Sequence, residues 1–169
     1  MTDTIINKVS KSGLVTIEMK DFQGDQKRAI VDIKNWLYKG MILKEKEFRA
    51  HLKNHNWALY SDQYVAIECS VDTIIPVWAY MLVVNYLKPF ATKTILGNKH
   101  LLEREIFEIN IKQLNTVEYT EKRILIKGCS DTYIPEESYV LISELLMDCA
   151  KSLMFGEACS NVPIFKRKN

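Results

Sequence analysis

The feature that most constrains the fold of this chain is a segment that occurs twice at a constant spacing. Each copy begins with an apolar stretch, passes through a polar loop that ends in proline, and continues as a helical pattern and a second apolar stretch closed by glycine. The spacing is the 59 residues that separate Pro76 from Pro135. At this spacing the identical pairs include Asp72 and Asp131, Thr73 and Thr132, Tyr80 and Tyr139, Leu87 and Leu146, Ala91 and Ala150, and Gly97 and Gly156. The repeat predicts two β-loop-α-β units, at residues 64–97 and 123–156.

The segments outside the repeat predict further strands and helices. Residues 14–19 and 28–33 have strand composition and flank a turn-rich stretch, so we expect them to pair as an N-terminal hairpin. Residues 45–57 form an amphipathic helix pattern with Phe48 and Leu52 on one stripe, and residues 98–120 are mostly helical.

These elements together predict the fold class. A chain of 169 residues with 47% hydrophobic residues is long enough for one sizeable core, and no Pro/Gly/Ser-rich linker divides it. We therefore expect one α/β domain over residues 1–169, with a mostly parallel sheet, the duplicated β-loop-α-β units and an N-terminal strand pair plus helix. Right-handed crossovers would bring both repeat loops to the carboxyl-terminal edge of the sheet, where open α/β sheets bind ligands.

Charge and hydropathy argue against two classes of partner. The net charge of +2 gives no strong attraction to nucleic acid or to an anionic membrane, and the basic end at 166–168 is interpreted as a solvated tail. Residues 1–12 are polar, which predicts no signal peptide. The apolar run from Ile74 to Leu87 is shorter than the roughly 20 residues that cross a bilayer. We expect a cytoplasmic protein whose four cysteines stay reduced.

Three of the cysteines share one sequence context. Cys69, Cys129 and Cys159 are each followed by serine, and each comes after a predicted strand or its turn, whereas Cys149 falls in a helix. Thiolates are ligands for zinc, copper(I) and iron–sulfur clusters. If the three converge, they could hold an iron–sulfur cluster, or a zinc ion with His55 as the fourth ligand. The helix after each loop is expected to be capped by the Asp-Thr pair of the repeat, which would place Cys69 and Cys129 in the positive field of a helix start.

Other functions remain open at this point. Cys129 could act alone as the nucleophile of a thiol transferase or as a persulfide carrier. The cysteines could also only pack, in a non-catalytic interaction module. No Cys-x5-Arg loop, Gly-x-Ser-x-Gly elbow, phosphate-binding glycine loop or His-Glu-x-x-His motif is present, because Pro135 lies six residues after Cys129 and Leu52 follows His51. Whether the protein is an enzyme is undecided by the sequence, as is its oligomeric state.

Four ordered motifs, Asp32 to Leu37, Lys44 to Arg49, Cys69 to Pro76 and Phe155 to Pro163, resemble an uncharacterised bacterial family, domain of unknown function number 2480. The resemblance covers nearly the whole chain and brings no established activity. It implies a genomic association with iron–sulfur cluster assembly of the sulfur-mobilisation type. Assembly proteins would then be the partners, and Cys69, Cys129 and Cys159 would handle a cluster, iron or persulfide. His55 fits the family pattern, whereas His51 does not.

Overall fold

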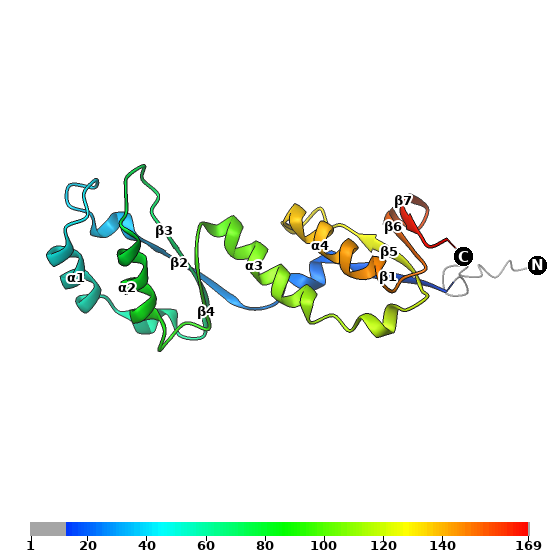
Figure 1. Cartoon of the computed structure of the whole chain (residues 1–169), viewed down its shortest axis with the longest axis horizontal. Coiled ribbons are helices and arrows are strands. Elements are labelled where there is room, and N and C mark those ends of the chain that lie inside the picture. Colours follow the sequence, from blue (N-terminus) through cyan, green and yellow to red (C-terminus); the bar gives the residue numbers. More distant parts are fainter. Residues whose placement is uncertain (1–12, 169) are drawn as a thin grey trace, which may run out of the picture. The chain divides into compact units, whose positions relative to one another are not determined.

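Two separate sheets, each built on three parallel strands, form the framework of the chain (Figure 1). The computed structural model describes residues 13–168. Residues 1–12, for which the sequence predicts no signal peptide, lie outside the described residues.

The first sheet has the order β1-β5-β6-β7 and the second the order β2-β3-β4. The strands are β1 (Leu14–Glu18), β2 (Lys27–Asp32), β3 (Gln63–Glu68), β4 (Lys93–Leu96), β5 (Arg123–Lys127), β6 (Ser152–Glu157) and β7 (Ser160–Lys166). The helices are α1 (Glu45–Asn54), α2 (Val77–Leu87), α3 (Lys99–Lys112) and α4 (Glu136–Met147).

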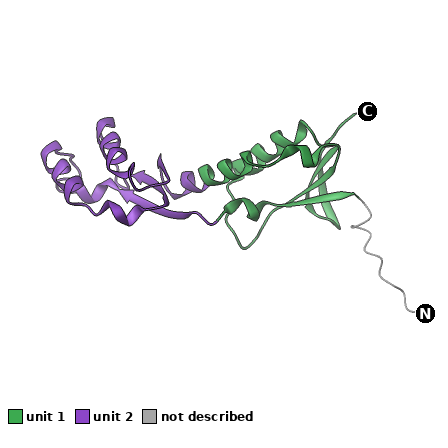
Figure 2. Cartoon of the chain, turned by 90° about the horizontal axis from the view of Figure 1, so that it is seen from below, with its two compact units in different colours: residues 1–24, 104–169 green, residues 25–103 purple. Residues whose placement is uncertain are grey.

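The chain divides into two compact units, and unit 2 is inserted into the sequence of unit 1 (Figure 2). Unit 1 comprises residues 1–24 and 104–169, and unit 2 comprises residues 25–103. Each unit has its own buried core. The sequence predicted one mostly parallel sheet, whereas the structure has two, because each unit pairs its own three parallel strands.

The repeat is longer than the sequence predicted, because it includes the elements before each β-loop-α-β unit. Each unit runs through a strand, a 3₁₀ helix, an α-helix, a second 3₁₀ helix, a strand, an α-helix and a strand. In unit 1 these are β1, η1 (Met19–Gln23), α3 from residue 104 onward, η4 (Thr116–Tyr119), β5, α4 and β6. In unit 2 they are β2, η2 (Ile33–Trp36), α1, η3 (Trp57–Tyr60), β3, α2 and β4.

Backbone geometry repeats at the spacing of 59 residues as well. Asp62 has a φ of 58° and Glu121 a φ of 57°, although neither is glycine. The N–H of Asp62 donates to a carbonyl at 3.1 Å just after α2, and that of Glu121 donates to one at 2.9 Å just after α4. The acceptors, Phe90 and Cys149, are themselves 59 residues apart. The two units therefore share their turns as well as their strands and helices.

In both units the helices cover the same face of the sheet. Alternate residues of the central strand, Val65 and Ile67 in β3 and Ile124 and Ile126 in β5, point to that face. Core side chains of the helices recur at the same spacing and are fully buried in both units. These pairs are Phe48 and Phe107, Leu52 and Ile111, Val83 and Ile142, and Leu87 and Leu146.

The N-terminal hairpin prediction is wrong. Strand β1 pairs in parallel with β5, and β2 pairs in parallel with β3. The turn residues between them instead join η1 to β2, and the polypeptide passes there from unit 1 to unit 2. Two neighbouring strand patterns favour a hairpin on local grounds, but the parallel partners of these strands lie far away in sequence.

The prediction of a solvated basic tail is wrong for Arg167. This residue follows β7, an antiparallel edge strand next to β6 that the sequence did not predict. Arg167 Nε donates to the carbonyl of Ala150 at 3.2 Å. Its Nη2 donates to the carbonyls of Met147 at 3.1 Å and of Asp148 at 2.9 Å. Arg167 thus satisfies carbonyl groups at the C-terminal end of α4, where a cation also suits the helix dipole.

Candidate functional site

The structure brings two of the predicted cysteines, Cys129 and Cys159, to one edge of one sheet. Strands β5 and β6 are parallel neighbours, and Ile126 pairs with Phe155 near their carboxyl ends. Cys129 follows β5 and Cys159 follows β6, so both lie beyond the carboxyl-terminal edge of the sheet of unit 1. This is the edge at which open parallel sheets bind ligands.

An ion-pair bridge ties together three strand ends at this edge. Lys127 Nζ, at the end of β5, lies 3.2 Å from Glu18 Oε1 and 3.1 Å from Glu157 Oε2. Glu18 ends β1 and Glu157 ends β6. The hydrogen bond to Glu157 raises the pKa of Lys127 most, and the hydrogen bond to Glu18 raises it further. The lysine therefore stays charged around neutral pH. The bridge positions the strand ends from which the two cysteine segments begin.

Cys159 lies in the tight turn of the β6–β7 hairpin and is exposed. Gly156 shapes this hairpin with a φ of 122°, a conformation that side chains other than hydrogen rarely allow. A Cβ atom on Gly156 would lie 2.7 Å from the carbonyl oxygen of Ser160 across the hairpin. The turn that carries Cys159 therefore depends on glycine at this position.

Cys129 is half-buried and packs against the core of unit 1, as does Tyr139. Tyr139 packs edge-on against Phe155, with ring centroids 5.7 Å apart and planes at 90°. Its hydroxyl lies 3.1 Å from the position of a Cβ atom added to Gly128, the residue before Cys129. Burial raises the pKa of Tyr139, and the charge of an ionised Cys129 raises it further. A neutral tyrosine hydroxyl is able to donate a hydrogen bond to sulfur.

Unit 2 carries a related but distinct loop after its central strand. Cys69 is half-buried, and its Sγ lies 3.6 Å from the carbonyl oxygen of Val71. Burial raises the pKa of Tyr80, and an ionised Cys69 raises it further, as for Tyr139 and Cys129. At the spacing of 59, however, Cys69 corresponds to Gly128, and Ser70 corresponds to Cys129.

A carboxylate of unit 2 holds Ser70, the residue that corresponds to Cys129. Its N–H donates to Asp32 Oδ1 at 3.1 Å and its hydroxyl donates to Asp32 Oδ2 at 2.6 Å. Burial alone would raise the pKa of Asp32, but these bonds and those from Lys34 hold it below its usual value of 3.8. In unit 1 the register places Glu18 at the position of Asp32, and Glu18 binds Lys127. The two loops have therefore diverged in what fixes them.

His55 lies near the other end of the sheet of unit 2. Its Nε2 is 3.0 Å from the hydroxyl of Tyr60, just before β3, and its ring packs against Trp57 at 4.7 Å. Burial lowers its pKa, so the imidazole is neutral at pH 7. Cys69 follows the opposite end of β3, and the ends of a six-residue strand are roughly 17 Å apart. His55 and Cys69 therefore do not share an edge of the sheet.

A site with four protein ligands inside one unit does not fit this arrangement. Cys129 and Cys159 belong to unit 1, and Cys69 and His55 belong to unit 2. Among residues 13–168, no group of three or more His, Cys, Asp or Glu side chains is placed to hold a metal ion. The two thiols of unit 1 are the part of the predicted ligand set that the fold brings to one edge.

The predicted helix caps are wrong. The N-cap residues are Pro76 and Pro135, and neither α2 nor α4 has a side-chain capping bond. Thr73 donates its hydroxyl to the carbonyl of Met41 at 2.6 Å instead, and Ser130 Oγ lies 3.1 Å from Asp131 Oδ1. The prolines keep the preceding residues out of the helical conformation, so the Asp-Thr pairs remain in the loops.

Sequence reasoning did not predict Tyr139, Lys127 or Glu157 as neighbours of the thiols. The signal for Tyr139 was present, since it is one of the identical pairs of the repeat, with Tyr80 as its partner. Lys127 and Glu157 carried no comparable signal, because their meeting depends on the pairing of β5 with β6.

No helix in the described part of the chain is both long and apolar enough to cross a membrane. A family model matches residues 3–167, and the chain belongs to this family, which is described as Protein of unknown function (DUF2480). No curated protein and no solved structure matches the chain.

Proposed function

We propose that this chain is a small accessory protein that binds a thiophilic metal ion or an iron–sulfur cluster through Cys129 and Cys159. One observation supports this above the others. The two cysteines follow neighbouring parallel strands and so lie at the same edge of the sheet of unit 1. Thiolates are the ligands that zinc, copper(I) and iron–sulfur clusters prefer.

Two thiolates fill only part of the usual coordination. Structural zinc takes four ligands, and iron–sulfur clusters are usually held by four cysteines. The remaining ligands would come from a partner that delivers or receives the metal, which suits an accessory protein better than a permanent structural site. Components of iron–sulfur cluster assembly, which the family resemblance implies, are the partners that this proposal calls for. The cytoplasm, where thiols stay reduced, is the expected compartment.

The experiment is metal binding by the full chain under anaerobic conditions. Wild type and four single Cys→Ser variants are titrated with Zn²⁺ and copper(I), and are separately reconstituted with iron and sulfide. We expect Cys129→Ser and Cys159→Ser to lose the metal, whereas Cys69→Ser and Cys149→Ser retain it. Cys149 is the matched control, because it is half-buried and its Sγ lies 3.5 Å from the carbonyl oxygen of Leu146. Full retention by both Cys129→Ser and Cys159→Ser would refute the proposal.

A second candidate, a persulfide carrier centred on Cys129, is favoured by the Tyr139 hydroxyl, which lies against Gly128, the residue before Cys129. In this reaction the Cys129 thiolate attacks the outer sulfur of a donor persulfide. A sulfur–sulfur bond forms at Cys129, and the donor leaves as a thiolate. The product is heavier by one sulfur atom, which intact-protein mass spectrometry detects. Loading of Cys159 or Cys69 in preference to Cys129 would rule out this assignment.

A further inference from the structure

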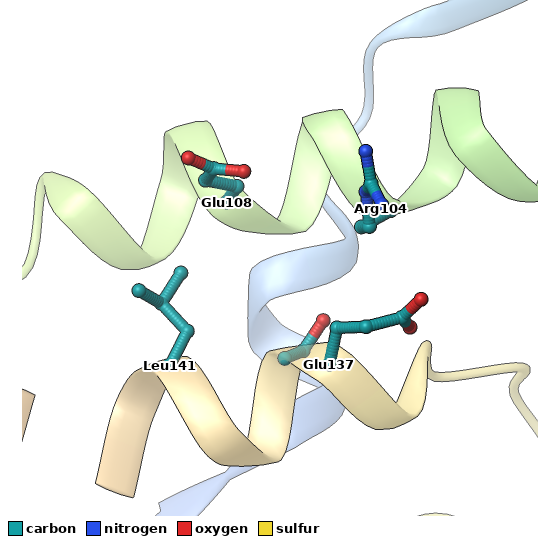
Figure 3. Close-up of a pocket in the computed structure, with 5 residues that line it drawn as sticks. Arg104, Glu108, Glu137 and Leu141 are labelled. Atoms are coloured by element: carbon teal, nitrogen blue, oxygen red, sulfur yellow. The ribbon is translucent and has the colours of Figure 1, made fainter. Parts of the chain in front are cut away.

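A pocket of about 250 Å³ opens between α3 and α4 of unit 1, and none of the cysteines lines it. Its lining consists of Arg104 and Glu108 from α3 and of Glu137, Ser138 and Leu141 from α4. Figure 3 shows the two helices side by side, with Leu141 pointing from α4 toward α3. The corresponding positions of unit 2 show which features of this pocket the fold does not require.

The first such feature is a buried hydroxyl group. Ser138 is only 2% exposed, and its Oγ has no hydrogen-bond partner among residues 13–168. A buried polar atom without a partner is rare in folded proteins, because it loses its bonds to water. The corresponding residue of unit 2 is Ala79, which is fully buried. The fold thus needs a small side chain here, and the hydroxyl is an addition that a bound molecule could satisfy.

The second feature is the space itself. In unit 2 the position of Glu137 is occupied by Trp78, whose ring packs edge-on against Phe48 at 6.1 Å. Phe107, the counterpart of Phe48, is retained and fully buried in unit 1. Unit 1 has a glutamate where unit 2 has this tryptophan, so unit 1 lacks the aromatic ring between its two helices. The pocket therefore lies where the other unit is filled.

The third feature is the arrangement of charge. The positions of Arg104 and Glu108 are held in unit 2 by Glu45 and Arg49, which form an ion pair at 2.9 Å. In unit 1 Glu108 pairs with Lys112 instead. Arg104 is thereby left without an ion pair inside the described part of the chain. A guanidinium group at a pocket mouth is a suitable partner for a carboxylate.

From these three features we infer that the pocket binds a small zwitterion with one carboxylate and one ammonium group, of the α-amino acid class. The Arg104 guanidinium binds the carboxylate of the ligand. The carboxylates of Glu108 and Glu137 offer acceptor positions to its ammonium group in addition to the bonds they already make. The Ser138 hydroxyl binds a polar atom of the ligand, and Leu141 contacts its apolar part. The volume lies below the roughly 300–1,000 Å³ of drug-sized pockets, which restricts the ligand to a small molecule.

The experiment is calorimetric titration of the full chain with the twenty standard amino acids. Two matched panels accompany it: carboxylates that lack the ammonium group and amines that lack the carboxylate. At least one amino acid is expected to bind wild type more tightly than its matched carboxylate and amine. Ser138→Ala, which copies unit 2, should weaken binding about tenfold through the loss of one hydrogen bond. Arg104→Gln and Glu137→Trp should abolish it, and Glu45→Gln in unit 2 should leave it unchanged.

Circular dichroism establishes that each variant is folded. If Glu137→Trp does not fold, Glu137→Phe fills part of the pocket with a smaller aromatic ring and takes its place. Absence of binding by every amino acid would overturn the inference, as would equal binding by wild type and the filled variant. Equal affinity for an amino acid and its matched carboxylate would overturn the assignment of a zwitterion.

Discussion

Replacement of Gly156 by alanine tests how the hairpin that carries Cys159 is built. Two costs are expected. The φ of 122° is a conformation that costs a residue other than glycine about 1–3 kcal/mol. The new Cβ would also lie 2.7 Å from the carbonyl oxygen of Ser160, a backbone atom that β6–β7 pairing holds in place. Displacement of packed backbone adds about 1–3 kcal/mol, so the free energy of unfolding of unit 1 should fall by about 2–6 kcal/mol.

Gly13→Ala in the same unit is the matched control. Gly13 also has a positive φ, of 64°, but nothing lies within 4 Å of an added Cβ. Only the conformational cost of about 1–2 kcal/mol should remain. The difference between the two variants therefore measures the contact with Ser160 together with any extra conformational cost of the φ of 122°.

The assay has to report on unit 1. All three tryptophans lie in unit 2, so their fluorescence is unsuitable. Hydrogen exchange of peptides from β5, β6 and β7, followed by mass spectrometry in increasing urea, gives the required free energies. A Gly156→Ala variant within about 0.5 kcal/mol of Gly13→Ala, a difference typical of neutral substitutions, would refute this account of the hairpin.

Three further predictions concern side chains whose partners the structure identifies. Arg167→Ala should lower the free energy of unfolding of unit 1 by about 1–3 kcal/mol, because its hydrogen bonds to the end of α4 are lost. In the same hydrogen-exchange assay, Lys168→Ala should change this free energy by less than about 0.5 kcal/mol. Equal effects would contradict the capping role. Burial lowers the pKa of His55 below 6.5, so unit 2 should lose stability as the pH falls below about 6.5. In urea titrations followed by tryptophan fluorescence, His55→Phe should remove that pH dependence. An unchanged pH profile would show that His55 is not its source. Ser70→Ala should raise the pKa of Asp32 toward 3.8 in a carboxyl titration by nuclear magnetic resonance, and an unaltered pKa would mean that the hydroxyl does not stabilise the carboxylate.

Much of the fold could be predicted from the sequence, because the repeat was visible where its residues are identical. The mixed α/β class, the mostly parallel pairing and the β-loop-α-β units are confirmed. The earlier half of each unit was not recognised as repeated, since it shares mainly apolar positions such as Phe48 and Phe107. Strand β7 was missed because its sequence contains Pro163, which an edge strand tolerates near an irregularity in pairing.

The candidate site was predictable only in part. The position of Cys129 and Cys159 after strands follows from local sequence patterns, and parallel pairing then brings them to one edge. Their separation from Cys69 and His55 could not be predicted, because it depends on which strands share a sheet. The pocket at Ser138 carried no motif, and it becomes visible only when unit 2 shows Trp78 and Ala79 at the same positions.

The most direct test of the central claim asks whether Cys129 and Cys159 act as one dithiol. A chain with Cys69→Ser and Cys149→Ser retains only these two thiols. It is treated with a trivalent organoarsenical, which binds stably when two sulfur atoms are close enough to hold one arsenic atom. We predict one arsenical per chain by intact-protein mass spectrometry, loss of both free thiols, and protection of both by prior addition of Zn²⁺. Two thiols that remain free after treatment, or that alkylate independently in the presence of Zn²⁺, would contradict the account.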